Sequence, residues 1–489
     1  MSYPRLLAAC VCMGALAQTP PAPVAEYANL GFAWRLHQEL ARSGSNENLV
    51  WSPLSLQSVL AVVAEGARGK TAAELGTCLG LPASARRSGD EERPWDFTVL
   101  HQANRAAVAA LRAPWAAPDQ VEARRLNEVA HGKPDRRTRG KMEELTTTGD
   151  DYRGPYQPFV FRSVDRLVVE RDLPLEQDYL GSIRALYPEG TIERVDFKHG
   201  HEAERLRMNQ WITRQTDGII RDPISANAWK PGTRLAAVNV TYLRADWSHR
   251  FDPEKTQLDR FSALGERSIL RVPMMSHVES CRYVAVNRDG SVFPTPGEVP
   301  AATRDEDPAY YPKEGGYHVI EKTYAGQRAS MVLVLPTRFG RLADLEAALT
   351  PAHLEVILRD GKERYCFVKM PKFKTRTLIS LPAPLARLGL STLTDGFNAN
   401  LTGIHVPVQP QDRLRMESLD QVTDIEVNEK GTVAVSVTFG AGIGGGGGAG
   451  PKTRPFVPQF IANQAFLYFI KDNETGQVLF IGRMTNPAR

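Results

Sequence analysis

The sequence is poor in cysteine, in net charge and in long apolar runs. Five cysteines occur among 489 residues, too sparse a set for a disulfide framework, and they form no CxxC pair or histidine cluster that would hold zinc. Lysine and arginine number 60 against 56 acidic residues, and a net charge of +4 does not indicate a nucleic-acid partner. Because no segment approaches about 18 consecutive apolar residues, we also expect no membrane span.

Complete catalytic motifs are missing as well. Gly440–Gly445 matches the GxGxxG pattern, but more glycines and Pro451 follow, where a dinucleotide site needs the start of a helix. Gly69-Lys70-Thr71 is similar to the end of a phosphate loop, yet Ala64 occupies the position of the first glycine of that motif. HExxH and GxSxG do not occur. We therefore expect no enzymatic activity, no catalytic residues, no cofactor and no metal.

The N-terminus has the pattern of a secretory signal. Arg5 precedes the apolar run Leu6–Ala17, which ends in small residues, and a proline-rich stretch follows. We predict a signal peptide over 1–17 and a linker over 18–25, and hence a secreted, extracellular or periplasmic protein. A first helix of the fold and a lipoprotein-type acylation at Cys10 are the alternatives.

Residues 26–489 are predicted to form one α+β domain. Four early segments are predicted to be helices: 26–40, a segment that starts at Ser52-Pro53 and carries apolar residues as far as Val63, 71–79 and 100–111. Thr71 and Glu74 have the spacing of a capping box for the third of these. Strand-like runs dominate later, at 235–243, 331–335, 365–373 and 466–482. Helices first and strands later favour large mixed sheets rather than a βαβ repeat.

Two segments have the composition of surface insertions, 112–157 and 291–316. The first carries a run of basic residues, namely Arg124, Arg125, Lys133, Arg136, Arg137 and Arg139. Such a run could bind an anion, a sulfated polysaccharide above all, or could simply be a solvated loop that nearby acidic residues partly neutralise.

A strand-competent segment leads directly into a glycine tract. From Thr432 to Phe439 small or polar residues alternate with apolar ones, which is the period of a strand. Residues 440–450 then contain eight glycines in eleven positions, a composition typical of an exposed loop. The pattern by itself also fits an ordinary edge strand followed by a turn.

Several motifs together resemble the serpin family, and the resemblance extends from about Tyr27 to Pro487. The motifs are Asn48–Ser55, Gly66–Leu75, Asn239 with Tyr242, Trp247 and Phe251, Val272–Met275, Val427–Thr432, Ala465–Ile470 and Phe480–Arg483. The resemblance implies a fold of about nine helices and three β-sheets. It also implies an exposed reactive loop, here about 429–456, that a target protease cleaves and that then inserts into the largest sheet.

The resemblance assigns the hinge of this loop to Glu429, Lys430, Gly431, Thr432, Val433, Ala434, Val435 and Ser436. A strand that enters a sheet needs a small, uncharged inward face, and Thr432, Ala434, Ser436 and Thr438 supply one. The opposite row is apolar and begins at Val433, where relatives are commonly acidic. Such an exposed β-prone row would favour polymerisation.

Sheet opening is assigned by the same resemblance to a cluster of Ser52, Ser55, Asn239, Gln421 and Trp247. An Asn inside a buried strand must be hydrogen-bonded, so we expect Asn239 to join neighbouring elements. Gln421 stands where the family usually has histidine. Glutamine can both donate and accept, so the cluster would survive without the pH sensitivity of a histidine.

The scissile bond is left with four candidates because the loop is longer than is usual in the family. Counting forward from the hinge leads to Gly445, with Ile443 beside it, whereas counting back from Phe466 leads to Arg454. Lys452 is a fourth candidate, since Pro455 follows Arg454. We therefore predict a monomeric inhibitor of serine, or alternatively cysteine, endopeptidases whose partner is the target protease. The rival interpretation is a non-inhibitory serpin that serves as a binding, carrier or scaffold protein.

Overall fold

The computed structural model describes residues 30–44, 46–112, 159–187, 190–265, 269–313, 315–337, 341–409, 412–430 and 453–489. Several predicted features lie outside these residues. They are the signal peptide and linker, the basic run from Arg124 to Arg139, and the loop from Gly431 to Lys452 with the candidate positions Ile443, Gly445 and Lys452.

The part of the chain that is described contains nine α-helices. They are α1 (Leu30–Ser43), α2 (Pro53–Gly66), α3 (Gly69–Leu79), α4 (Thr98–Arg112), α7 (Gln177–Leu186), α8 (Phe197–Gln215), α9 (Leu342–Ala348), α10 (Pro351–Arg359) and α11 (Pro382–Arg387). Short 3-10 turns occur at η2 (Ala83–Ala85), η3 (Pro253–Lys255), η4 (Pro308–Tyr310) and η5 (Thr392–Thr394). The helix predicted to begin at Ser52-Pro53 is confirmed, with Ser52 as N-cap.

The capping box predicted for α3 is wrong. The helix begins at Gly69, and its N-cap residue Arg68 makes no side-chain capping bond. The Thr71 hydroxyl lies 2.9 Å from that of Thr392, and Glu74 accepts a 2.8 Å bond from the Thr392 backbone N–H. Both side chains therefore attach α3 to η5, a tertiary contact that the local spacing could not reveal.

The strands of the described residues form three sheets, and the predicted α+β class is confirmed. The nine-stranded sheet has the order β1 (Leu49–Trp51), β16 (Val478–Met484), β15 (Phe466–Asp472), β9 (Ala329–Pro336), β8 (Tyr317–Thr323), β6 (Leu270–Val286), β10 (Lys362–Pro371) and β14 (Gln459–Ile461), with β5 (Gln257–Phe261) beside β6. The five-stranded sheet has the order β11 (Phe373–Ser380), β12 (Ser418–Val427), β4 (Leu235–Arg244), β2 (Val160–Glu170) and β3 (Ile192–Val195). The third sheet pairs β13 (Thr453–Pro455) with β7 (Glu298–Pro300).

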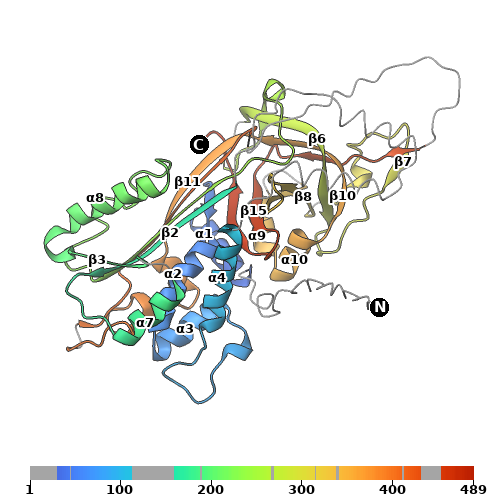
Figure 1. The fold of residues 1–489 in the computed structure, drawn as a ribbon. Coiled ribbons are helices and arrows are strands. Elements are labelled where there is room, and N and C mark those ends of the chain that lie inside the picture. The colour runs from blue at the N-terminus through green and yellow to red at the C-terminus, as the bar shows by residue number, and fades with distance from the viewer. Residues whose placement is uncertain are drawn as a thin grey trace, which may run out of the picture.

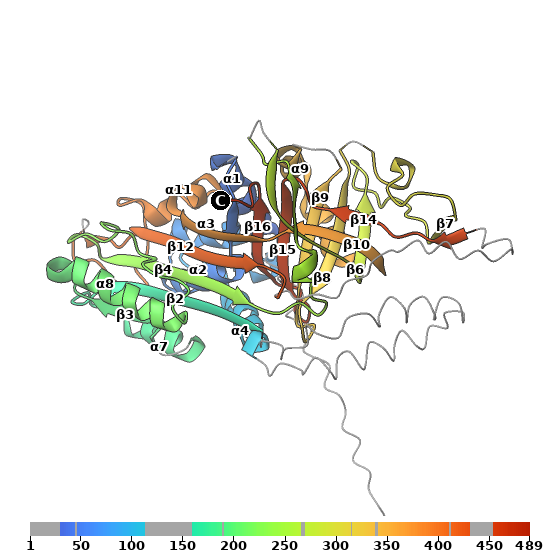
Figure 2. The same cartoon turned by 90° about the horizontal axis from the view of Figure 1, so that it is seen from above.

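The five-stranded sheet is covered on both faces. Figure 1 shows α8 on one side of it and α2, α3, α4 and α7 on the other, and Figure 2 shows β12, β4 and β2 side by side. Accordingly β4 is buried from Leu235 to Tyr242, as its continuous apolar run predicts. Its alternate residues pack against α8 and against the core around α2.

Helix α2 lies at the centre of the molecule, and every residue in it except Glu65 is buried. It packs against β16 of one sheet and against β2 and β4 of the other. Because α2 packs against β2 and β4, its first residues lie directly under the five-stranded sheet.

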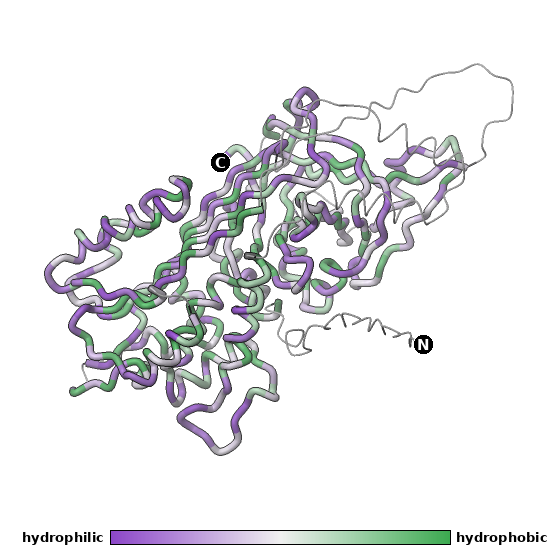
Figure 3. Tube along the Cα trace, viewed as in Figure 1, coloured by the Kyte–Doolittle hydropathy of each residue, from purple (hydrophilic) through white to green (hydrophobic). Residues whose placement is uncertain are grey.

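The loop that follows η2 is different: it faces solvent, and hydrophilic residues prevail in it (Figure 3).

Candidate functional site

The candidate site is the seam between β4 and β12. These strands are parallel neighbours, and their register places Gln421 opposite Asn239 and Thr423 opposite Thr241. All four residues are buried. The hydroxyls of Thr241 and Thr423 have no hydrogen-bond partner among the described residues, which is uncommon for buried polar groups. The seam is therefore closed mainly by the backbone ladder and by the Asn239–Gln421 contact.

Gln421 connects the seam to the start of α2. Its Oε1 accepts a 2.8 Å bond from the Ser52 backbone N–H, and its Nε2 donates to the Ser52 carbonyl at 3.0 Å. The same Nε2 donates to Asn239 Oδ1. Because helix N-termini leave N–H groups without helical partners, a glutamine at this point caps α2 and bridges the two strands.

Asn239 extends this network to β2. Its Nδ2 donates to Ser55 Oγ at 2.5 Å and also to Asp165 Oδ1. Ser55 Oγ in turn donates to Asp165 Oδ1 at 2.8 Å. The structure thus brings Ser52, Ser55, Asn239 and Gln421 together, and it adds Asp165, which the sequence analysis did not include. The signal that could have found it is a carboxylate two residues before the apolar, strand-like run Leu167–Val169.

The described hinge residues follow the end of β12. Glu429 is only 8% exposed, and its carboxylate accepts from Lys372 Nζ and from Thr256 Oγ1, each at 2.8 Å. Burial acts to raise the pKa of Glu429, but these two donors outweigh it and hold the pKa below its ordinary value. The Lys430 N–H donates to Asn428 Oδ1 at 2.9 Å. The hinge is therefore anchored up to Lys430.

Trp247 lies beside this hinge and apart from the Asn239 cluster. Its backbone N–H donates to the Lys430 carbonyl at 3.3 Å. Its ring stacks on Tyr324, with ring centroids 4.4 Å apart and an 8° angle between the planes. Trp247 thus links the hinge to the end of β8 rather than to the seam.

A fully buried lysine supports the segment that contains Trp247. Lys322 Nζ lies 2.8 Å from both carboxylate oxygens of Glu279 and donates to the His249 carbonyl at 2.6 Å. It also sits over the rings of Phe251, at 4.6 Å, and Trp247, at 5.2 Å. Burial acts to raise the pKa of Glu279, but the Lys322 charge outweighs it and keeps this carboxyl ionised. The ion pair therefore ties the 247–251 segment to β6 and β8.

Helix α8 covers the opposite face of the seam. Its residues Met208 and Ile212 pack in one cluster with Val240 of β4 and Val422 of β12, which face each other across the seam. Opening the seam to admit a strand must therefore disturb the packing of α8.

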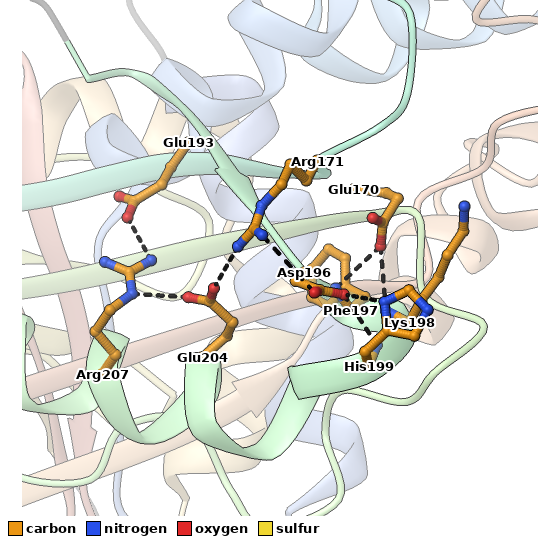
Figure 4. Close-up of polar contacts among 9 residues, drawn as sticks. All are labelled: Glu170, Arg171, Glu193, Asp196, Phe197, Lys198, His199, Glu204 and Arg207. Atoms are coloured by element: carbon orange, nitrogen blue, oxygen red, sulfur yellow. Dashed lines mark hydrogen bonds and ion pairs between the residues drawn. The ribbon is translucent and has the colours of Figure 1, made fainter.

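Ion pairs hold the N-terminal half of α8 against β2 and β3 (Figure 4). Glu204 accepts from Arg207 Nε at 2.7 Å and from Arg171 Nη2 at 3.3 Å, and Arg207 also reaches Glu193 of β3 at 2.7 Å. Glu170, at the end of β2, accepts from the first backbone N–H of α8 at 2.9 Å. These polar contacts therefore attach the helix to β2, β3 and the residue after β2, whereas its contact with the seam is apolar.

Arg454 is the one candidate scissile residue within the described residues. It lies in β13 opposite Val299, in contact with the predicted 291–316 insertion. Its guanidinium forms a 2.8 Å ion pair with Asp305 and donates to the Thr303 carbonyl at 2.6 Å. A side chain so engaged would have to leave these partners before a protease could bind it.

Comparison with known proteins identifies the family. The sequence model of the family described as serpin (serine protease inhibitor) matches residues 27–487. An uncharacterised serpin-like protein of Thermococcus kodakarensis is 29% identical, over 93% of this chain and 84% of the relative. Human serpin I2 is 25% identical, over 94% and 91%, and mouse antithrombin-III is 26% identical, over 94% and 81%.

Two solved structures share the fold. Uncleaved ovalbumin has a TM-score of 0.64 at 21% identity, and thyroxine-binding globulin in complex with thyroxine has 0.66 at 19%, each over 94% of this chain and 98% of the other. The chain therefore belongs to the serpin family, whose members in general inhibit proteases and are not catalysts. No helix in the described part of the chain is long and apolar enough to span a membrane.

Proposed function

We propose that this serpin is a single-use inhibitor of serine, or alternatively cysteine, endopeptidases that acts by inserting its cleaved reactive loop between β4 and β12. The sheet that would receive the loop is thus the five-stranded one and not, as expected from the sequence, the largest, which here has nine strands. The observation that carries the proposal is the seam itself. Two parallel neighbours can each bond to one antiparallel strand placed between them, and the loop segment follows directly in sequence from β12, which ends at Val427.

The side chains at the seam support the same proposal. Thr241 and Thr423 are buried without hydrogen-bond partners among the described residues. An inserted strand would present Thr432, Ala434, Ser436 and Thr438 to this face. Two of these hydroxyls could then bond to the two buried threonines.

The rival function is a non-inhibitory carrier or scaffold role. Two observations favour it: the glycines of 440–450, each of which disfavours a strand by up to about 1 kcal/mol, and the engagement of Arg454 with Asp305. The two functions differ in what happens after cleavage. An inhibitor traps the protease covalently, whereas a carrier is only cut.

A panel of trypsin-, chymotrypsin-, elastase- and subtilisin-like proteases separates the two. We expect an SDS-resistant adduct with at least one protease and a sharp rise in the melting temperature of the cleaved chain. Ala434→Arg, on the predicted inward face, should abolish both, while the matched variant Val435→Arg should retain them. Cleavage that gives no adduct and no thermal shift with any protease would refute inhibition.

We also propose that the chain is exported and that its basic run binds a sulfated polysaccharide. The pattern of residues 1–17 supports export, and N-terminal sequencing of protein recovered outside the cell would locate the signal-peptide cleavage site.

For the basic run, retention on a sulfated polysaccharide column should weaken when Arg136, Arg137 and Arg139 become Ala. Elution unaffected by that change would reject the polysaccharide site.

A further inference from the structure

Among the described residues, Asp165 is the one ionisable side chain that bonds to Asn239 in the hydrogen-bond network that closes the seam. It lies on β2, one strand away from the seam, and its side chain is only partly exposed. Its Oδ1 accepts from Ser55 Oγ at 2.8 Å and from Asn239 Nδ2, and its Oδ2 accepts from Ser163 Oγ at 2.9 Å. A carboxylate accepts bonds only, so all three partners must turn donors toward it.

This contact determines which way the Asn239 amide points. With its NH₂ group toward Asp165, Asn239 presents Oδ1 to β12, where Gln421 Nε2 donates to it. Gln421 has one carbonyl and one amino group, and the backbone of Ser52 occupies both. The orientation of the Asn239–Gln421 hydrogen bond is therefore fixed from both ends, by Asp165 of β2 and by the Ser52 backbone.

Among the described residues, Asp165 is the member of this network that can gain or lose a proton in the ordinary pH range. The facing groups of α2, β4 and β12 are Ser55, Asn239 and Gln421, none of which ionises in the ordinary pH range. Arg166, beside it on β2, donates to the Asp165 carbonyl at 3.4 Å and lies 3.9 Å from Glu193.

A second titratable group lies further off, at the end of α7. Burial raises the pKa of Tyr187, so its phenol stays neutral. The phenol lies 2.5 Å from His101 Nδ1 of α4, and His101 Nε2 lies 3.3 Å from Glu65 of α2. Within the described part of the chain these side chains form a separate network, and none of them bonds to the Asp165 carboxylate.

We propose that Asp165 is the positioning residue of the seam: it orients Asn239 toward Gln421, and its ionisation sets how firmly β4 and β12 are held together. The closed sheet is then most resistant to opening in mildly acidic solution and less resistant at neutral pH. The consequence for protease inhibition rests on the proposed function, whereas the pH dependence of the uncleaved sheet does not.

The direction of this pH dependence follows from the thermodynamic link between proton binding and folding stability. Burial is the largest influence and raises the pKa of Asp165 to about 6, although its donors and the Arg166 charge favour ionisation. A carboxyl with a raised pKa binds more protons in the closed fold than in an unfolded or hydrated state, so stability falls as pH rises from about 4 to about 6. Between those limits the equilibrium constant for unfolding should increase by up to about a hundredfold.

The test compares uncleaved wild type with Asp165→Asn and with Asp172→Asn, a control in the exposed turn after β2. Thermal and urea unfolding are followed in steps from about pH 3.5 to about pH 7.5, which spans the interval between the unfolded and the folded pKa of Asp165. We expect wild type and Asp172→Asn to lose stability relative to Asp165→Asn as pH rises from about 4 to about 6, and this difference in stability to stay constant above about pH 6. Other titrating groups contribute equally in all three proteins. A difference in stability between wild type and Asp165→Asn that does not change with pH therefore overturns the proposal.

Hydrogen exchange on wild type provides a readout that does not depend on the folding of a variant. After correction for intrinsic exchange, protection of 235–244 and 418–427 should fall as pH rises from about 4 to about 6, while protection of 466–484 should not. A uniform trend in all three peptides would count against Asp165. Neither experiment involves a protease, so a failure here is distinguishable from a failure of the proposed inhibition.

Discussion

The Glu429 carboxylate and the Lys372 ammonium lie 2.8 Å apart, and this pair joins the residue just beyond β12 to the bend between β10 and β11. Glu429 is the second residue beyond the end of the strand, and Thr256 bonds to its other oxygen. The pair therefore fixes the point at which the chain leaves the five-stranded sheet.

Replacing Glu429 with Gln should weaken this anchor. We expect the free energy of unfolding of the uncleaved protein to fall by about 1–2 kcal/mol, because a partly buried, charge-assisted pair is lost. Glu426→Gln is the matched control: Glu426 pairs with Lys374, both are more than half exposed, and its loss should change stability by less than about 0.5 kcal/mol. Urea unfolding gives both values.

The Glu429 effect should also depend on pH. Its pKa is below the ordinary value, so the stabilisation is present above the unfolded pKa and is lost as pH falls through the folded pKa. The difference between wild type and Glu429→Gln should therefore shrink below about pH 4. A difference that stays constant down to acid unfolding would contradict this assignment.

Removing one partner of the buried Lys322–Glu279 pair should be severe. Lys322→Met leaves the Glu279 carboxylate buried without its main counter-charge, which costs about 3–5 kcal/mol. Adding Glu279→Gln should recover a large part of the loss. A double-mutant cycle by urea unfolding measures the coupling, and purely additive losses would show that the two charges do not support each other.

Glu204→Gln should loosen α8 from the sheet, since this carboxylate binds both Arg171 and Arg207. We expect a loss of up to about 1 kcal/mol at low salt that largely disappears in about 0.5 M salt. Glu202→Gln is the control, because its partner Arg205 lies within α8 itself. Hydrogen exchange of α8 should rise only in the Glu204 variant, and an equal rise in both would reject the anchoring role.

Two glycine-to-alanine changes should have opposite effects. An added Cβ at Gly76 would lie 2.3 Å from Trp95 Cδ1, whereas one at Gly181 would meet nothing within 4 Å. We expect Gly76→Ala to destabilise the fold by about 1–3 kcal/mol through overpacking. Gly181→Ala, in the exposed face of α7, should stabilise it by about 0.5–1 kcal/mol. Melting temperatures of the two variants settle the comparison.

The start of α2 and the burial of β4 could be predicted from sequence because both depend on local pattern. Pro53 suits a first helical turn, and the run from Leu235 to Leu243 leaves no polar face apart from Asn239 and Thr241. The same pattern predicted that Asn239 would bond to neighbouring elements, and it does so on both sides.

The contacts across the seam could not be predicted in this way because they depend on register between distant strands. Asp165 meets Asn239 only because β2 and β4 pair with those two residues opposite each other. Trp247 follows β4 closely in sequence, yet the chain beyond that strand turns toward β8 and the hinge. Thr71 and Glu74 had the right spacing for a cap, but their hydroxyl and carboxylate are used by η5.

The placement of β14, β15 and β16 has a consequence for any molecule cut in the loop before Thr453. Residues 453–489 supply two interior strands of the nine-stranded sheet, with Phe466–Ile470 and Val478–Met484 fully buried. The fragment downstream of the cut is thus held inside the nine-stranded sheet by the pairing of β15 and β16 with their neighbours. A nicked molecule should travel as a single particle through native chromatography, one water heavier than before, and part into two chains only in denaturant.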